Sequence, residues 1–212
     1  SSTSGGFVRQ ESSSQISFIN AGSAIDLTGS FTPVVGTWYH IAVTRNASNL
    51  MTIWVNGSSV GSGTVTTSYS SGTFAIGANH YSGGTTGYFP GYISNVRLVT
   101  GSCLYTSSFT PSTTPLTAVS GTQVLTCQSN RFIDNSSNNF TITPSGSSAV
   151  LPYSPFNPTS AYSAATQSGS GYFSSNSFAV ANLGSSTKKT SNSLPSFRGK
   201  PVISIFSVLL FN

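Results

Sequence analysis

The chain has very little charge for its length. Only 5% of its 212 residues are Asp, Glu, Lys or Arg, and three of these are acids. Glu11, Asp26 and Asp134 stand far apart, so the sequence offers no ready pair of carboxylates for glycoside hydrolysis. Serine and histidine also occur, but no Gly-x-Ser-x-Gly elbow sits at a strand-to-helix turn. We therefore expect no enzyme activity.

The positive charge is concentrated at one end. The formal net charge is +5, yet four of the eight basic residues lie after position 187. The remaining four arginines against three acids leave residues 1–187 almost neutral, at +1. A nucleic-acid groove needs clustered Lys and Arg, and these arginines are scattered. The sequence therefore argues against a nucleic-acid partner.

Cysteine is almost absent, with only Cys103 and Cys127. Their separation admits a disulfide, and it equally admits two small buried hydrophobic side chains. The sequence leaves both alternatives open. Two cysteines with the isolated His40 and His80 give no zinc pattern.

Long hydrophobic runs are missing as well. Residues 1–6 show neither the charged start nor the apolar stretch of a signal peptide. The apolar residues 201–211 are far shorter than the roughly 20 residues of a membrane span. We expect no membrane partner.

Polarity comes instead from Ser, Thr, Gly and Asn, while aromatics make up 12% of the chain. That aromatic content provides enough apolar area for a folded core. A surface wetted by hydroxyls and amides is typical of extracellular or virion β proteins. We therefore predict an extracellular or virion-surface location.

Residues 36–57 carry the strongest local signal. Two alternating apolar runs flank a polar connection, which predicts an antiparallel strand pair. Asn56-Gly57 favours a type I′ turn into a third strand at 58–61. If the alternating apolar residues of both strands share the inner face, Val43 must lie opposite Ile53.

Other alternating segments predict further strands. They lie at residues 15–20, 24–27, 64–67, 74–78, 88–99, 122–127 and 140–143, with a bulge expected near Ser94 and Asn95. No first strand is evident before residue 15. Residues 103–109 are expected to form a compact turn, and 140–143 a hairpin after the polar residues 135–139. Four prolines between 144 and 158 mark the expected exit from the domain.

The order of these motifs resembles a known family. Residues 36–45 (GTWYHIAVTR), 54–57 (WVNG), 74–77 (FAIG) and 89–97 (FPGYISNVR) are similar to the laminin G-like, concanavalin A-like lectin superfamily. Residues 104–156 resemble a narrower branch, found as tandem repeats in phage tail-fibre-like and other virion structural proteins. The resemblance covers about residues 15–156.

The resemblance implies an all-β, antiparallel jelly-roll β-sandwich that is incomplete at its N-terminus. It places the sandwich in residues 1–156. The expected Gly-Tyr-Phe strand occurs only at 170–173. Residues 157–183 are therefore interpreted as a linker plus either the first strand of a second repeat or a strand that completes the first. Residues 184–212, basic and then apolar, depart from the family and are expected to be an assembly tail or a gene-end artefact.

Two segments are candidate sites. Asn79, His80, Tyr81 and Tyr88 combine amides and rings beside flexible glycines, as glycan binding requires, although the two tyrosines could simply cover the core. Calcium is the common ion of the resembled family. Asp134, Asn135 and Asn138 are a weak calcium candidate, with an Asx-capped turn as the alternative. No other cofactor is expected.

The sequence thus predicts a non-enzymatic, lectin-like module that acts in attachment, with a cell-surface glycan as its partner. The alternative is a purely structural virion or fibre subunit that assembles with copies of itself or with other virion proteins. Such a subunit would form a homo-oligomer through its sheets and termini without a small ligand.

Overall fold

All the regular structure that the computed structural model describes is β-strand. The described residues are 2–20, 24–70, 74–81, 84–151, 155–156, 179–182, 187–189 and 203–211. The strands are β1 (Ser2–Ser4), β2 (Gly6–Ser12), β3 (Gln15–Asn20), β4 (Ile25–Ser30), β5 (Trp38–Arg45), β6 (Leu50–Val55), β7 (Ser58–Thr64), β8 (Ser68–Ser70), β9 (Ala75–Ile76), β10 (Asn79–Tyr81), β11 (Gly84–Thr86), β12 (Gly91–Thr100), β13 (Thr122–Thr126), β14 (Ile142–Pro144), β15 (Ala149–Leu151), β16 (Ala179–Asn182), β17 (Thr187–Lys189) and β18 (Ile203–Phe211).

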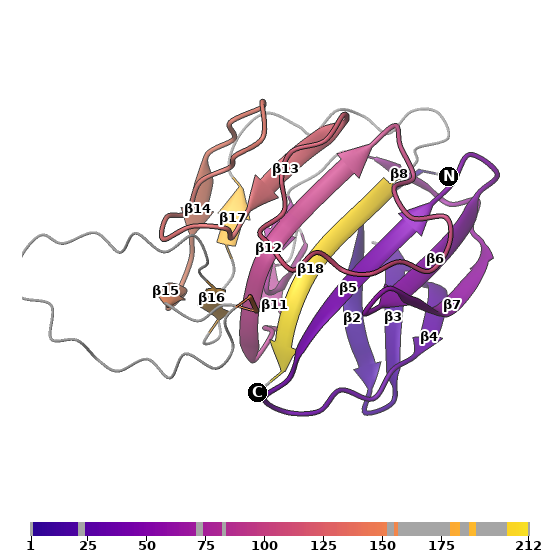
Figure 1. Ribbon diagram of the computed structural model, residues 1–212, viewed down its shortest axis with the longest axis horizontal. Helices are drawn as coiled ribbons and strands as arrows, with labels where there is room; N and C mark the ends of the chain where they lie inside the picture. The colour runs from indigo at the N-terminus through magenta and orange to yellow at the C-terminus, as the bar shows by residue number, and fades with distance from the viewer. Residues whose placement is uncertain are drawn as a thin grey trace, which may run out of the picture.

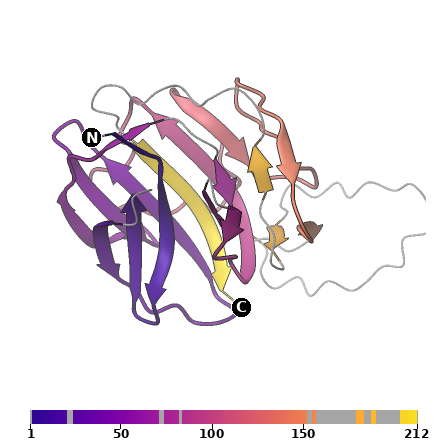
Figure 2. The ribbon, with the colours of Figure 1, turned by 180° about the vertical axis from the view of Figure 1, so that it is seen from behind.

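Two sheets form the body of the molecule. The larger has the order β15-β16-β12-β18-β5-β6-β7, and β13 pairs with the part of β12 that β16 leaves open (Figure 1). The three-stranded sheet β2-β3-β4 lies behind it, as the view from the back shows (Figure 2). The pairing is antiparallel except between β1 and β8. The predicted all-β antiparallel sandwich is thus confirmed.

The central strand pair has the predicted register. β5 and β6 place Val43 directly opposite Ile53. At the turn, Asn56 and Gly57 have φ angles of 49° and 81°, and β7 returns from Ser58, as the Asn-Gly turn predicts. The alternating residues of both strands enter the core between the sheets, whose buried apolar members are Ile16, Phe18, Phe31, Ile41, Val43, Met51, Ile53, Val55, Val65, Tyr69, Leu98 and Val124.

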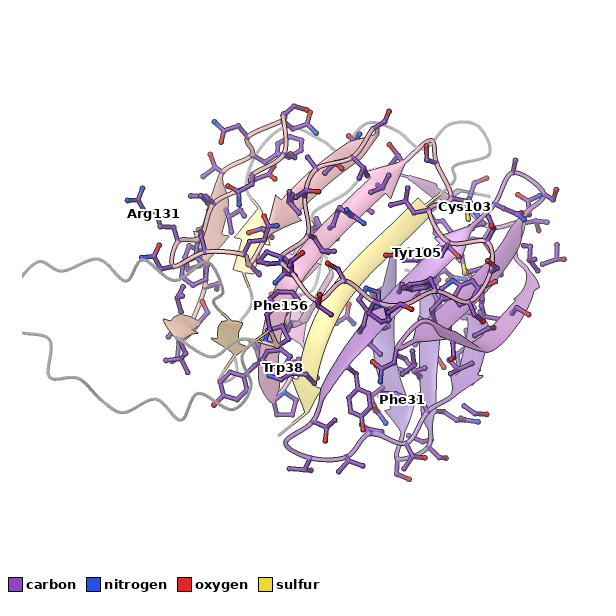
Figure 3. All side chains as sticks on the ribbon, in the orientation of Figure 1. Phe31, Trp38, Cys103, Tyr105, Arg131 and Phe156 are labelled. Atoms are coloured by element: carbon purple, nitrogen blue, oxygen red, sulfur yellow. The ribbon has the colours of Figure 1, made fainter. Side chains whose placement is uncertain are left out.

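The opposite face of the large sheet is also covered. Residues 101–121 run across it without regular structure, and Figure 3 shows Tyr105 on this segment above the sheet. A second apolar cluster fills the space, made of Ala42, Trp54, Val99, Leu116 and Leu125, with Leu104, Tyr105 and Phe109 packed against it. The indole nitrogen of Trp54 donates to the Thr44 hydroxyl at 2.8 Å. Trp54 is therefore a packing residue of the outer face of the large sheet.

Residues 101–121 are called the covering segment below. A bulge in β12 helps to hold this segment in place. Its ladder with β18 shifts between Ser94 and Arg97, and Asn95 has a φ of 56°, which confirms the predicted bulge. The Asn95 side chain is fully buried, and its oxygen accepts the backbone N–H of Leu116 at 2.8 Å. The bulge thus turns the Asn95 side chain toward the covering segment, where it satisfies the backbone N–H of Leu116.

Gly57, in the turn between β6 and β7, lies against the backbone of Phe109 in the covering segment. Its carbonyl accepts the Phe109 N–H at 3.0 Å, and a Cβ at Gly57 would lie 1.7 Å from the Phe109 carbonyl oxygen. Because its φ is also positive, only glycine fits here without displacing the segment.

Several sequence expectations differ from the structure. A strand does precede residue 15, because β2 pairs along β3 from Gly6 to Ser12. Residues 65–67 are not a strand, and residues 103–109 form bends without a helical turn. β14 pairs with β17 rather than closing a hairpin with the residues before it. The pairings of β2 with β3 and of β14 with β17 involve weakly alternating or distant segments, so the local sequence pattern could not specify them.

The largest difference concerns the end of the chain. β18 lies in the middle of the large sheet, between β12 and β5, and is the yellow strand in Figure 1. Residues 203–211 therefore belong to the sheet and are no appendage to it. The Gly-Tyr-Phe strand expected at 170–173 lies outside the described residues, but β16 pairs with both β12 and β15.

Candidate functional site

The predicted ligand loop is a short hairpin. β10 and β11 pair with Asn79 opposite Thr86, His80 opposite Thr85, and Tyr81 opposite Gly84. Tyr88 follows the hairpin with 45% of its surface exposed, and its hydroxyl donates to the Thr85 carbonyl at 3.3 Å. The side chains of His80 and Tyr81 lie outside the described part of the structure. An exposed ring held against a hairpin backbone is thus what the structure shows of this site.

The backbone next to Tyr88 is anchored to the body of the molecule. Just after it, the N–H of Phe89 donates to the carbonyl of Gly77 at 2.8 Å, which ties the end of the loop to its beginning. Phe89 itself packs into a small apolar cluster with Ile93 and Val96. These contacts anchor the backbone next to Tyr88 and leave its ring at the surface. The exposed ring therefore argues against the alternative that Tyr88 only covers the core.

Asp134 lies in a polar turn and is almost fully buried, with 4% of its surface exposed. One carboxylate oxygen accepts the backbone N–H groups of Leu125 and Ser136, at 2.9 and 3.0 Å. The other accepts the Ser136 hydroxyl at 2.8 Å and the Phe140 N–H at 3.0 Å. The carboxylate is therefore saturated by four donors.

This donor set bears on the calcium candidate. Calcium takes oxygen lone pairs, and those of Asp134 already accept hydrogen bonds. The NH2 groups of Asn138 and Asn135 donate to the Gln123 carbonyl at 3.0 Å and to the Gln128 side chain, so both side chains help to hold the turn. Among the described residues no group of three His, Cys, Asp or Glu gathers to hold a metal ion. The geometry favours the Asx-capped turn over the calcium alternative.

Cys103 and Cys127 are both free thiols, so the structure does not form the disulfide that was one of the two alternatives. Cys127 lies buried beside Ile93 and Val96, and burial raises the pKa of its thiol to about 12. Cys103 lies on the covering segment, where its sulfur donates to the Tyr105 carbonyl at 3.4 Å (Figure 3). Cys127 thus acts as a small hydrophobic side chain, which is the other alternative that the sequence left open.

The three acids have separate roles on separate elements. Glu11 pairs with Arg9 at 2.6 Å on the surface of β2. Asp26 accepts hydrogen bonds on β4, and Asp134 is enclosed by its turn. Glycoside hydrolysis requires two carboxylates that face one substrate bond. The described residues contain no such arrangement.

A buried polar cluster around Arg45 gave no signal in the sequence. Arg45 is 2% exposed, and its guanidinium donates to the carbonyls of Val65 and Thr67, at 3.3 and 2.6 Å. It lies 5.0 Å from the centre of the Tyr69 ring. Desolvation lowers the pKa of Arg45, while the charge of Asp26 partly offsets this effect.

Asp26 completes this cluster from β4. Its carboxylate accepts the hydroxyls of Tyr69 and Thr67, at 2.5 and 3.1 Å, and the amide of Asn20 at 2.9 Å. Burial, followed by the hydrogen bond to Asp26, raises the pKa of Tyr69. The cluster joins β4, β5 and the residues after β7, so it ties the two sheets together.

A second buried group lies under the covering segment. His40 on β5 is 6% exposed and contacts the rings of Tyr105 and Phe109, with centroids 6.2 and 5.5 Å away. Arg97, also buried, donates to the Thr117 carbonyl at 2.8 Å. Burial and then the charge of Arg97 lower the pKa of His40 to about 4. His40 is therefore a neutral packing residue under residues 101–121.

We expect the free energy of unfolding to fall as the pH drops from 6.5 to 4. The unfolded chain protonates His40 near its ordinary value of 6.5, whereas the folded chain does so only near 4. The unfolded state therefore gains a proton first, which costs about 2 to 3 kcal/mol of stability by pH 4. Urea titrations at pH 7 and pH 4 measure this loss. The substitution His40→Phe keeps a ring but removes the titration, so an equal loss in both proteins contradicts the assignment.

A small cavity lies beside the buried Asp134. It measures about 10 Å³, the size of a single water, and is lined by Phe74, Ile76, Val124, Thr126, Asp134, Phe140 and Ile142. It is far too small for a sugar, since ligand pockets measure roughly 300 to 1,000 Å³. The exposed ring of Tyr88 is not among the residues that line this cavity. No helix of the described chain has the length and hydropathy to cross a membrane.

Comparison with known families agrees with this architecture. Residues 1–103 match the model of the concanavalin A-like lectin/glucanases superfamily. No curated protein and no solved structure shows significant similarity to the chain. The match covers β1 to β12, which include the whole β2-β3-β4 sheet and the β5-β6-β7 meander. The all-β antiparallel sandwich is consistent with the fold of this superfamily.

Proposed function

We propose that the chain is a non-enzymatic, lectin-like module of an extracellular or virion surface protein, and that it acts in attachment by binding a glycan. The observation that carries this proposal is the exposed ring of Tyr88 beside the β10-β11 hairpin. It stands on a scaffold whose first 103 residues are similar to a lectin and glucanase superfamily. A virion location of the tail-fibre kind remains part of the proposal.

The chemistry of the surface fits a neutral sugar. An aromatic ring covers the apolar face of a pyranose, while amide and backbone groups bond its hydroxyls. Tyr88 supplies the ring, and the half-buried Asn79 stands at the base of the same hairpin.

The positions of Glu11, Asp26 and Asp134 support binding without catalysis. The three carboxylates of the chain are engaged by Arg9, by the Arg45 cluster and by the 134–140 turn. None of the three lies at the hairpin, so a sugar held by Tyr88 would meet no acid and base pair.

A glycan array with the full chain tests the proposal. We expect binding to a defined set of neutral glycans, and Tyr88→Ala should weaken it at least about tenfold, or about 1.4 kcal/mol. Tyr88→Phe, which keeps the ring, should retain most of the affinity. Ile25→Ala is the matched control, because Ile25 is 50% exposed on β4. An array without binding, or equal binding by Tyr88→Ala and wild type, would overturn the proposal.

A second candidate is a structural subunit that assembles without a small ligand. The observation that favours it is the central position of β18 in the large sheet, between β12 and β5. This candidate predicts a defined oligomer and no hit on the array. A protein that remains a monomer at high concentration, measured by sedimentation, would rule it out.

A further inference from the structure

Individual hydrogen bonds, rather than a β-ladder, hold the covering segment to the large sheet. None of residues 101–121 belongs to a strand. The Phe109 N–H donates to the Gly57 carbonyl at 3.0 Å, and Arg97 on β12 donates to the Thr117 carbonyl at 2.8 Å. Apolar packing on the outer face of the sheet adds to these bonds. A segment attached in this way can separate from the sheet while the strand pairings stay intact.

His40 projects from β5 against this segment. It is 6% exposed, and the rings of Tyr105 and Phe109 lie edge-on to it, with centroids 6.2 and 5.5 Å away. These two rings stack on each other at 3.4 Å, and Figure 3 shows Tyr105 above the sheet. Arg97, also buried, is the cation whose charge acts on His40. Protonation of His40 in this closed arrangement would therefore add a second buried cation between sheet and segment.

No described carboxylate offsets that charge. The acids of the chain are engaged on β2, on β4 and in the 134–140 turn, and they are Glu11, Asp26 and Asp134. The titratable side chains of the covering segment are Cys103 and Tyr105, and burial raises the pKa of Tyr105, which keeps its hydroxyl neutral. β6 and β18, the two neighbours of β5, contain no titratable residue. The neutral Asn56, in the turn after β6, accepts the backbone N–H of His40.

We propose that the covering segment is a pH-gated flap, and that protonation of His40 in mildly acidic solution releases residues 101–121 from the outer face of the large sheet. Release admits water to the imidazolium and screens it from Arg97, which removes the cost of burying two cations. It also exposes an apolar surface on the sheet, formed by Ala42, Trp54, Val99 and Leu125. The flap goes beyond the proposed function and does not depend on glycan binding at Tyr88.

The closed and open states of the flap bind a proton at different pH. Burial and the charge of Arg97 lower the pKa of His40 to about 4 in the closed state, whereas a hydrated histidine titrates near 6.5. The open state therefore gains its proton first as the pH falls. The equilibrium constant for opening should rise about thirtyfold between pH 7.5 and pH 5.

Amide hydrogen exchange of the full chain at pH 7.5 and pH 5 tests the flap. The exchange rate of each peptide is divided by the intrinsic rate of its unfolded sequence at the same pH, which leaves the opening constant. Peptides that contain Phe109 and Leu116 are expected to gain about thirtyfold, because these N–H groups bond Gly57 and Asn95 in the closed state. Peptides from β5 and β6 should keep their protection at both pH values.

His40→Phe is the matched control, because it keeps a ring and cannot titrate. Its opening constant for residues 101–121 should be the same at both pH values, and the neutral His40→Gln repeats this control if the ring variant does not fold. Equal protection of residues 101–121 in the wild type at both pH values overturns the proposal. A loss of protection that β5 and β6 share also overturns it, because that result is global unfolding, and so does an equal gain in the His40 variants. A negative glycan array leaves each of these results unchanged.

Discussion

Replacing Asp26 by alanine is expected to lower the free energy of unfolding by about 3 kcal/mol or more. Its carboxylate accepts hydrogen bonds from Tyr69, Thr67 and Asn20, and it is the nearby acid whose charge acts on the buried Arg45. Removing one member of a buried charged network leaves the other charge uncompensated, which typically costs 3 to 5 kcal/mol. Urea unfolding followed by tryptophan fluorescence measures the change.

Glu11→Ala is the matched control for this prediction. Glu11 also pairs with an arginine, but the Arg9 side chain is 49% exposed, so solvent screens the pair. Exposed ion pairs contribute about 0 to 1 kcal/mol, and Glu11→Ala should lie within that range. The double substitution Asp26→Ala with Arg45→Met should recover part of the loss, because it removes the buried charge as well. If Asp26→Ala destabilises no more than Glu11→Ala, the cluster does not hold the sheets together.

Proline at Ser207 is expected to cost at least about 3 kcal/mol and to disrupt the large sheet. Ser207 lies in the middle of β18 and pairs with Ile41, while neighbouring residues on both sides pair with β12. Proline removes the backbone N–H and cannot continue a ladder in the centre of a sheet. Leaving a buried partner unsatisfied adds about 1 to 3 kcal/mol to that effect. Thermal unfolding of the full chain measures the loss.

The control for this prediction is Ser207→Ala, which removes only the hydroxyl and keeps the backbone donor. We expect it to change the free energy of unfolding by less than about 1 kcal/mol. Comparable stability of Ser207→Pro and Ser207→Ala would show that residues 203–211 are not part of the ladder.

The sequence predicted the local features of the fold well. Alternation in β5 and β6, together with the Asn-Gly turn, fixed the register that brings Val43 opposite Ile53. The break in alternation before Val96 located the bulge of β12. Both features depend on residues that lie close together in the chain, so the local alternation of apolar and polar residues is enough to predict them.

The non-local features could not be predicted in that way. Arg45 gave no signal, because its partners Asp26 and Tyr69 come from other elements and each is an ordinary polar residue in its own segment. The position of β18 depends on a gap between β5 and β12, and the apolar run indicates only a buried strand. The first strands were missed because β2 contains Arg9 and Glu11 at outer positions and alternates weakly.

The candidate site was predicted in part. The glycines and aromatic residues of segment 79–88 predicted a ligand-binding surface loop. The structure adds that the loop is a hairpin and that Tyr88 is exposed. The turn at Asp134 illustrates the limit of such reasoning. The same residue types suit calcium or an Asx cap, and only the donors around the carboxylate distinguish the two.

Residues 203–211 form the middle strand of the large sheet, and the rest of that sheet depends on this position. Amide hydrogen exchange, resolved by peptide, tests it directly in the full chain. The account predicts that peptides from β18 exchange as slowly as those from β5 and β12, its two partners. Exchange of residues 203–211 at the rate of an unfolded peptide, with β5 still protected, would contradict it.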